Sequence, residues 1–135
     1  MRFARVIAVL ANWRMAGMVF VGGAIGTMLR HLIGEVFGSS YEFPTSDFLA
    51  LVFVNLVGSY FLGLTARHPI FASEQRKAFF GTGLAGGFTT MSALTLFIDT
   101  QGLSPEIALL LFIGPATYAF GWHQGRRRAK KVGNE

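Results

Sequence analysis

The stretch Gly86–Ser92 reads Gly-Gly-Phe-Thr-Thr-Met-Ser and lies in the middle of a long uncharged segment. Glycine and β-branched threonine both weaken an α-helix, so this run predicts a helix break over Gly86–Thr90. Unwound backbone at membrane depth offers carbonyl groups to a cation, and N–H groups and hydroxyls to an anion. Alternatively, Gly81, Gly83 and Gly87 only allow close helix packing. The residues alone leave both interpretations open.

Two further polar residues stand in apolar surroundings. Asn55 lies almost at the centre of an uncharged segment, where its amide needs a partner. It can hold two helices together, which is the more frequent case, or donate its N–H groups to an ion. Arg30 lies within a turn of the end of another apolar segment, where it can extend to the membrane surface or line an anion vestibule.

The chain carries no signature of an enzyme. It has no cysteine, which excludes disulfides, thiolate metal sites and cysteine nucleophiles. We find no cluster of His, Asp and Glu for a metal and no pair of nucleophile and base. The apolar segments contain no Asp or Glu, which argues against a proton-coupled carrier.

The elements that must position these residues are four apolar blocks. Hydrophobic residues make up 52% of the 135 residues and charged residues only 14%, against about 25% in a typical soluble domain. The blocks are Met15–Ile33, Phe48–Ala66, Ala78–Ile98 and Ile107–Trp122. Since about 20 residues cross the hydrocarbon core, we expect an all-α membrane protein with four transmembrane helices, the third broken mid-membrane.

The charged residues predict one orientation in the membrane. In a four-helix arrangement both termini and the loop between helices 2 and 3 share one side. All basic residues except Arg30 fall on that side, namely Arg2, Arg5, Arg14, Arg67, Arg76, Lys77, Arg126, Arg127, Arg128, Lys130 and Lys131. The other side holds Glu35, Glu42, Asp47, Asp99 and Glu106. Because Lys and Arg favour the cytoplasmic side, both termini should be cytoplasmic.

The two ends of the chain are basic. Residues 1–14 are expected to form an N-terminal extension at the membrane interface, and residues 15–125 the four-helix domain. Residues 126–135 are expected to be a solvated basic tail beside anionic lipid, with no role in binding nucleic acid.

Three motifs occur in order in helices 1 to 3. They are Gly22-Gly23-x-x-Gly26-x-x-x-Arg30, Asn55-Leu56-x-Gly58-Ser59-x-x-x-Gly63 and Gly86-Gly87-Phe88-Thr89-Thr90-x-Ser92. Together they resemble the Fluc (CrcB) fluoride channels over roughly residues 17–125.

The resemblance implies an antiparallel dimer of four-helix subunits with two fluoride pores. A central structural Na⁺ would bind backbone carbonyls at the positions of Gly86 and Thr89. Asn55 matches the pore asparagine and Arg30 the vestibule arginine, and Thr90 and Ser92 fall on polar pore positions. Fluoride is small and tightly hydrated, so hydroxyls, amide N–H groups and aromatic ring edges must replace its water.

The chain departs from the family pattern in its pore. The family usually reads TTFSTFS, and Met91 and Leu94 stand at its two phenylalanine positions. Helix 4 lacks the usual tyrosine and serine, and Thr117 and Tyr118 come a turn or more later. A degraded pore, together with the strong orientation bias, fits a subunit that pairs with an unlike homologous chain rather than with itself.

The sequence thus favours a subunit of a fluoride-specific channel that passively exports fluoride across a bacterial plasma (inner) membrane. Export follows from acid–base chemistry, because HF crosses membranes and ionises inside. Two alternatives stay open. One is a non-conducting scaffold subunit whose partner supplies the pore, and the other is a small dual-topology drug exporter.

Overall fold

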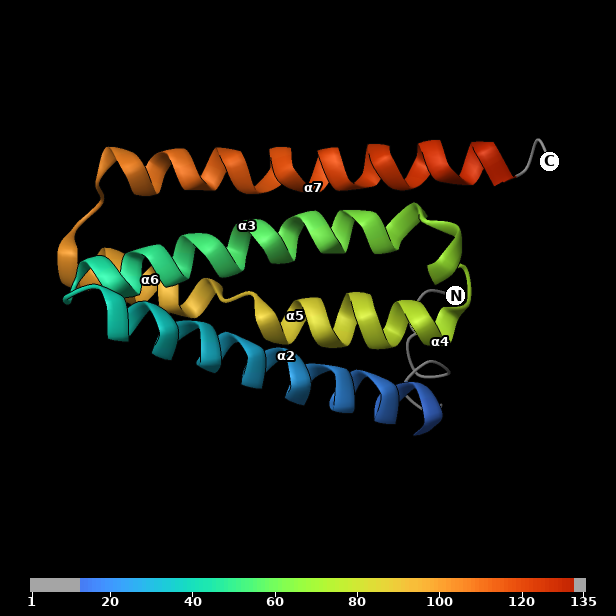
Figure 1. Ribbon diagram of the computed structural model, residues 1–135, viewed down its shortest axis with the longest axis horizontal. Helices are drawn as coiled ribbons and strands as arrows, with labels where there is room; N and C mark the ends of the chain where they lie inside the picture. Colours follow the sequence, from blue (N-terminus) through green and yellow to red (C-terminus); the bar gives the residue numbers. More distant parts are fainter. Residues whose placement is uncertain (1–12, 133–135) are drawn as a thin grey trace, which may run out of the picture.

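The computed structural model describes residues 13–132, which form four antiparallel helical segments (Figure 1). Two long helices come first and a third, interrupted segment follows before the last helix. The first two are α2 (Trp13–Ser40) and α3 (Thr45–Arg67), the last is α7 (Pro105–Val132), and the third segment comprises α4 (Glu74–Arg76), η2 (Lys77–Ala85), α5 (Gly86–Phe88) and α6 (Met91–Gln101). A short 3₁₀ turn, η1 (Pro69–Phe71), links α3 to the third segment. The expected all-α architecture with four helical segments is confirmed.

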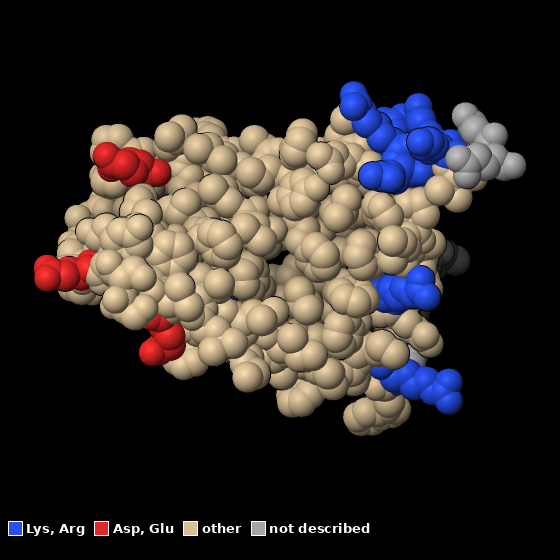
Figure 2. All heavy atoms as spheres, in the orientation of Figure 1, with Lys and Arg blue, Asp and Glu red and all other residues tan. Residues whose placement is uncertain are grey.

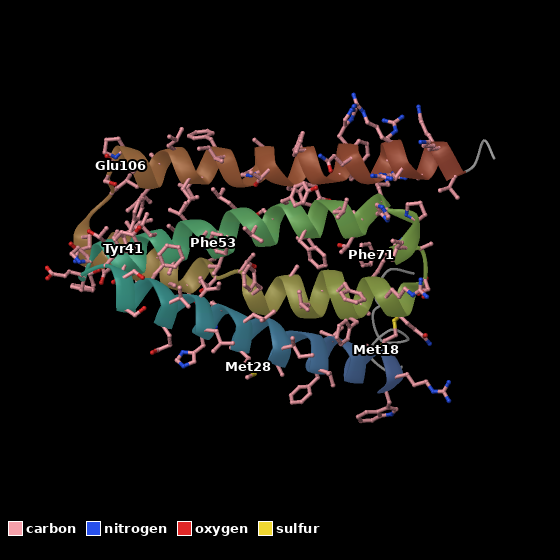
Figure 3. All side chains as sticks on the ribbon, in the orientation of Figure 1. Met18, Met28, Tyr41, Phe53, Phe71 and Glu106 are labelled. Atoms are coloured by element: carbon pink, nitrogen blue, oxygen red, sulfur yellow. The ribbon has the colours of Figure 1, made fainter. Side chains whose placement is uncertain are left out.

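Three of the four segments are long and apolar enough to cross a membrane, by length and composition: Trp13–Ser40, Thr45–Arg67 and Glu74–Gln101. Their outward side chains are large and hydrophobic; Met28 on α2, labelled in Figure 3, is 64% exposed. The chain therefore has the character of an integral membrane protein. In α7 the apolar part is followed by the basic residues Arg126–Lys131, which continue the same helix.

Glycines bring α2 against the third segment. An added Cβ on Gly22 would overlap the Phe79 carbonyl oxygen, and one on Gly26 would overlap that of Leu84. In return, a Cβ on Gly83 would lie 2.7 Å from the Val19 carbonyl oxygen. The two backbones are thus in direct contact, as expected of small residues at membrane helix interfaces. Within the third segment, η2 is wound with π-type hydrogen bonds over Lys77–Ala85.

Glycines also bring α3 against α7. A Cβ on Gly63 would overlap the Tyr118 carbonyl oxygen, and one on Gly121 would overlap that of Tyr60. In Figure 1, α3 therefore lies between α7 and the third segment, with α2 on the far side. This order places the middle of α3 beside the interruption of the third segment.

The apolar core has two parts, one near each end of the bundle. Buried Leu51, Leu94, Ile107 and Leu110 form one cluster, where α3, α6 and α7 meet. Aromatic rings form the other: Phe71 contacts Phe61 and Phe80 with ring centroids 5.8 and 5.2 Å apart. These clusters fix the ends of α3 against its neighbours.

Charged residues gather at opposite ends of the molecule (Figure 2). Lys and Arg lie where α2 begins, where α3 passes into α4 and where α7 ends; Asp and Glu lie mostly at the other end. Glu106, in the first turn of α7, is at that acidic end (Figure 3). A hydrogen bond from the Ser104 hydroxyl and the N–H of Glu106 itself lower the pKa of this carboxyl.

Candidate functional site

The third segment loses its helical backbone at two residues. Phe88 ends α5, Thr89 is extended (φ −79°, ψ 158°), Thr90 is also extended (φ −150°, ψ 114°), and Met91 begins α6. Gly86 itself has helical angles (φ −64°, ψ −37°). The interruption thus lies in the threonine half of the predicted Gly86–Thr90 run, and the glycines stay helical. Gly87 instead allows close approach to α2, since a Cβ there would overlap the Gly23 carbonyl oxygen.

Asn55 of α3 replaces the hydrogen bonds that the interruption removes. Thr90 N–H donates to Asn55 Oδ1 at 3.1 Å, and Asn55 Nδ2 donates to the Thr90 carbonyl at 3.3 Å. The same Nδ2 also donates to the Leu51 carbonyl at 2.9 Å. Both N–H bonds of the amide are therefore engaged. Asn55 holds α3 to the interrupted backbone of the third segment, which is the first of the two roles that its sequence position allowed.

Two carbonyl groups beside the interruption lose their helical donors. In a continuous helix the Thr90 N–H would bond to the Gly86 carbonyl, and the Ala93 N–H to the Thr89 carbonyl. Instead, Thr90 N–H bonds to Asn55, and Ala93 N–H donates to Thr90 Oγ1 at 3.1 Å.

Arg30 reaches the interruption from α2. Its Nη1 donates to the Thr89 carbonyl at 3.4 Å, and one turn earlier Thr27 Oγ1 donates to the Gly87 carbonyl at 3.4 Å. Arg30 as a whole is half-buried. The Thr89 carbonyl thus already faces a positive charge.

The donor set fits a monovalent cation only in part. Gly86 and Thr89 offer two carbonyl oxygens, which are hard ligands of the kind that unwound membrane helices present to Na⁺. Gly86 is exposed, with no heavy atom within 4 Å of the place of a Cβ, so its surroundings are open. Two oxygens do not enclose an ion, so a second chain would have to supply the remaining ligands.

The hydroxyls of Thr90 and Ser92 lie together. Thr90 Oγ1 is 3.3 Å from Ser92 Oγ and caps the start of α6. Ser92 is exposed on the first turn of that helix. The two hydroxyls can rotate to offer O–H groups to an anion, because a hydroxyl both donates and accepts.

Two cavities lie on either side of the interruption. The Arg30 cavity, about 340 Å³, is formed by α2, α3 and α6 and is lined by Arg30, Gly34, Phe43, Asp47, Ala50, Leu51, Val54, Thr90, Ala93, Leu96, Phe97 and Thr100. The Asn55 cavity, about 310 Å³, is formed by α3, α6 and α7 and is lined by Asn55, Ser59, Met91, Leu94, Leu110, Leu111, Gly114, Pro115 and Tyr118. Arg30 and Asn55 thus both hydrogen-bond to the interruption, but they line different cavities.

Met91 and Leu94, the expected degraded pore positions, differ in their surroundings. Both line the Asn55 cavity. Met91 is 65% exposed, whereas Leu94 is 4% exposed and belongs to the buried cluster with Leu51 and Ile107. Leu94 therefore has a packing role as well as a position in the cavity wall.

Sequence reasoning missed three polar residues of these cavities. Ser59 and Tyr118 line the Asn55 cavity, and Asp47 lines the Arg30 cavity. The spacing of four between Asn55 and Ser59 was a signal, since it places them on one face of a helix. Nothing in the sequence shows that Asp47 and Arg30 line the same cavity, because they belong to different helices.

Comparison with known proteins points to one family. Residues 17–121 match the family described as CrcB-like protein, Camphor Resistance (CrcB). A fluoride-specific ion channel FluC of Thermotoga maritima is 37% identical over 115 residues, covering 78% of this chain and 89% of the relative. FluC 1 of Cutibacterium acnes is 36% identical over 118 residues, covering 80% of each.

A third relative, FluC of Rhodopseudomonas palustris, is 37% identical over 86 residues, which cover 58% of this chain and 64% of the relative, less than two thirds of its length. No solved structure matches the chain. The family match covers more than half of the chain and includes the interruption, Asn55 and Arg30. On this evidence the chain belongs to the CrcB family.

Proposed function

We propose that this chain is a subunit of a fluoride-specific channel that lets fluoride leave the cytoplasm passively across a bacterial plasma membrane. The observation that carries the proposal is the interruption at Thr89–Thr90, held by Asn55 and approached by Arg30. The relatives' printed names, fluoride-specific ion channel, supply the ion.

The chemistry of the site supports an anion path. Arg30 lines a cavity that Thr90 also lines, so it can attract an anion to the interruption. Thr90 and Ser92 offer hydroxyls, and Ser59 and Tyr118 add two more in the Asn55 cavity. Such donors can replace the water of a small, tightly hydrated anion. Asn55 acts in this proposal as a pore-lining residue whose amide also fixes the Thr90 backbone.

The assembly we propose is an antiparallel dimer with an unlike homologous chain. A partner in the opposite orientation would add its own carbonyls to those of Gly86 and Thr89 and complete a structural Na⁺ site. The ion would neutralise carbonyl dipoles where two interruptions meet. All four helical segments cross the membrane in this assembly, and both termini lie in the cytoplasm. Residues 1–14 and 126–135 act as basic segments beside anionic lipid, flanking a channel domain over 15–125.

Fluoride efflux from liposomes tests the proposal. Purified chain, alone and with a homologous subunit of opposite charge bias, is reconstituted with internal potassium fluoride and valinomycin, and external fluoride is recorded with an electrode. We expect rapid efflux with both chains, little with one, and none when chloride replaces fluoride. Absence of fluoride efflux from both preparations, with helical folding verified by circular dichroism, would overturn the proposal.

A scaffold role is the second candidate, because the Asn55 cavity is lined mostly by apolar side chains and Leu94 is part of the core. Met91→Trp separates the two functions in the paired channel. The indole is larger than both methionine and the phenylalanine that the family usually carries at this position, so it obstructs fluoride if this chain's cavity conducts, and leaves efflux unchanged if the chain is only a scaffold. Met28→Trp is the matched control, since Met28 is 64% exposed and Met91 65%.

A further inference from the structure

Two arginines share one tryptophan ring at the basic end of the molecule. The guanidinium carbon of Arg67, the last residue of α3, lies 5.3 Å from the ring centroid of Trp122, and that of Arg126 lies 5.4 Å from the same centroid. Both distances are within the range of cation–π attraction. We call Arg67, Trp122 and Arg126 the Trp122 cluster.

The fold holds this cluster in place through glycines. Gly121 directly precedes Trp122 and lets α7 touch the Tyr60 carbonyl of α3. A Cβ on Gly125 would lie 2.9 Å from the His68 backbone nitrogen, one residue after Arg67. The end of α3 is thus in backbone contact with α7, and the half-buried indole of Trp122 is fixed beside it. The cluster is therefore built by two helices and is no accident of two flexible side chains.

The cluster concentrates positive charge without a neutralising group. Among residues 13–132, the one ion pair within 4.0 Å joins His31 and Glu35, far from this end of α3 and α7. Arg127, Arg128, Lys130 and Lys131 follow on the same helix and form a blue patch in Figure 2. Because both guanidinium carbons lie within 5.4 Å of one ring centroid, two like charges are held next to the same ring and repel each other, and an anion bound beside the ring relieves that repulsion.

We infer that the Trp122 cluster binds the headgroup phosphate of an anionic phospholipid. Guanidinium groups bind phosphate oxygens bidentately, and basic groups between helices bind acidic lipid headgroups. A lipid fits better than a soluble anion because indole rings settle at the level of membrane headgroups.

Tryptophan fluorescence provides a direct test on the full chain. The chain has two tryptophans, so Trp13→Phe leaves Trp122 as the sole reporter. This variant is placed in phosphatidylcholine liposomes containing rising fractions of acyl-brominated phosphatidylglycerol or acyl-brominated phosphatidylcholine. We expect the acidic lipid to quench Trp122 at a several-fold lower mole fraction than the neutral lipid.

Charge-matched variants separate a built site from general attraction. In the same background, Arg67→Gln and Arg126→Gln should each reduce the preference for the acidic lipid by clearly more than the roughly fivefold expected for any single charge near the surface. Arg128→Gln removes the same charge from the same helix but not from the ring, and should change the preference much less. Equal losses in all three variants, or equal quenching by the two lipids, would overturn the inference.

Two further experiments test the role of the Trp122 ring and distinguish a lipid headgroup from soluble phosphate. Trp122→Leu keeps both charges, and mass spectrometry of copurified lipid should show less phosphatidylglycerol than in the unmodified chain; unchanged content would contradict a role for the ring. Inorganic phosphate at matched ionic strength should leave the quenching preference intact. If phosphate abolishes it, the cluster is a soluble-phosphate site and the lipid assignment fails.

Discussion

Asn55 shows how one side chain can define a break in another helix. The amide pairs with both the N–H and the carbonyl of Thr90, so the N–H receives the partner that the Gly86 carbonyl would give in a continuous helix. An unpaired backbone group in hydrocarbon is costly. The interruption is therefore stable only while Asn55 of α3 lies level with Thr90 and bonds to it.

Asn55→Ala should destabilise the chain by about 1–3 kcal/mol, because it leaves the part-buried N–H of Thr90 without its partner. Thermal unfolding in detergent measures the loss, and fluoride efflux of the paired channel should fall with it. Ser59→Ala is the control for the stability measurement only, since Ser59 lines the same cavity one turn along α3. Unchanged stability of Asn55→Ala would show that Thr90 finds other partners.

Restoring aromatic residues should affect the two degraded positions differently. Leu94 is buried in the cluster with Leu51, Ile107 and Leu110, so Leu94→Phe overpacks it and should cost about 1–3 kcal/mol. Met91→Phe faces the open cavity and should leave the unfolding midpoint nearly unchanged while raising fluoride efflux through its ring edge. Equal destabilisation by both variants would contradict the assigned environments.

At the scale of the elements, the sequence predicted the helical segments well because apolar runs of about 20 residues have few alternatives in a membrane. It predicted an interruption within the Gly-Gly-Phe-Thr-Thr run, but for a partly different reason. Gly86 and Gly87 remain helical, and Thr89 and Thr90 unwind because Asn55 takes the Thr90 N–H. That hydrogen bond is tertiary, so no local pattern reveals it.

Other element-scale features also lay beyond local reasoning. The π-type winding of Lys77–Ala85 occurs where this segment is in close contact with α2. No residue spacing in the third segment predicts this winding. Helix α7 continues through the basic residues from Arg126 to Lys131. Their residue types agree with this, since Arg, Lys and Ala favour helices and cations stabilise a helix C-terminus. The two cavities arise only when three helices meet.

Gly121→Ala tests the glycine contact between α3 and α7. Its methyl group would overlap the backbone carbonyl oxygen of Tyr60, so the helices must separate, and we expect a loss of about 1–3 kcal/mol in unfolding free energy. Gly114→Ala, on the same helix with nothing within 4 Å, should be neutral or stabilise by up to about 1 kcal/mol. Similar effects of the two substitutions would contradict direct backbone contact.

At the scale of the whole molecule, the separated charges of Figure 2 make the two ends unequal. Polybasic segments are held at the inner leaflet by about 1 kcal/mol per charge, so inversion of this chain is strongly disfavoured. An antiparallel dimer needs both orientations. The proposed unlike partner follows from this conflict.

The absence of cysteine allows a clean orientation experiment in cells. A single cysteine introduced by Val132→Cys should react with a membrane-impermeant maleimide only after permeabilisation. Glu106→Cys, at the opposite end of α7, should react from outside in intact cells. Labelling of both positions in intact cells would show a mixed orientation and remove the need for an unlike partner.

The 3.4 Å contact between Arg30 Nη1 and the Thr89 carbonyl has a thermodynamic consequence for the proposed channel. A carbonyl oxygen that accepts a hydrogen bond from a guanidinium is a poor ligand for Na⁺. An anion that draws Arg30 away from the Thr89 carbonyl into the Arg30 cavity would therefore leave that oxygen free to bind Na⁺. Such coupling is reciprocal: fluoride should lower the Na⁺ concentration for half-maximal thermal stabilisation of the assembled channel, and Arg30→Gln should abolish the shift. Through the Thr89 carbonyl oxygen, fluoride would then strengthen the binding of the Na⁺ that holds the two subunits together.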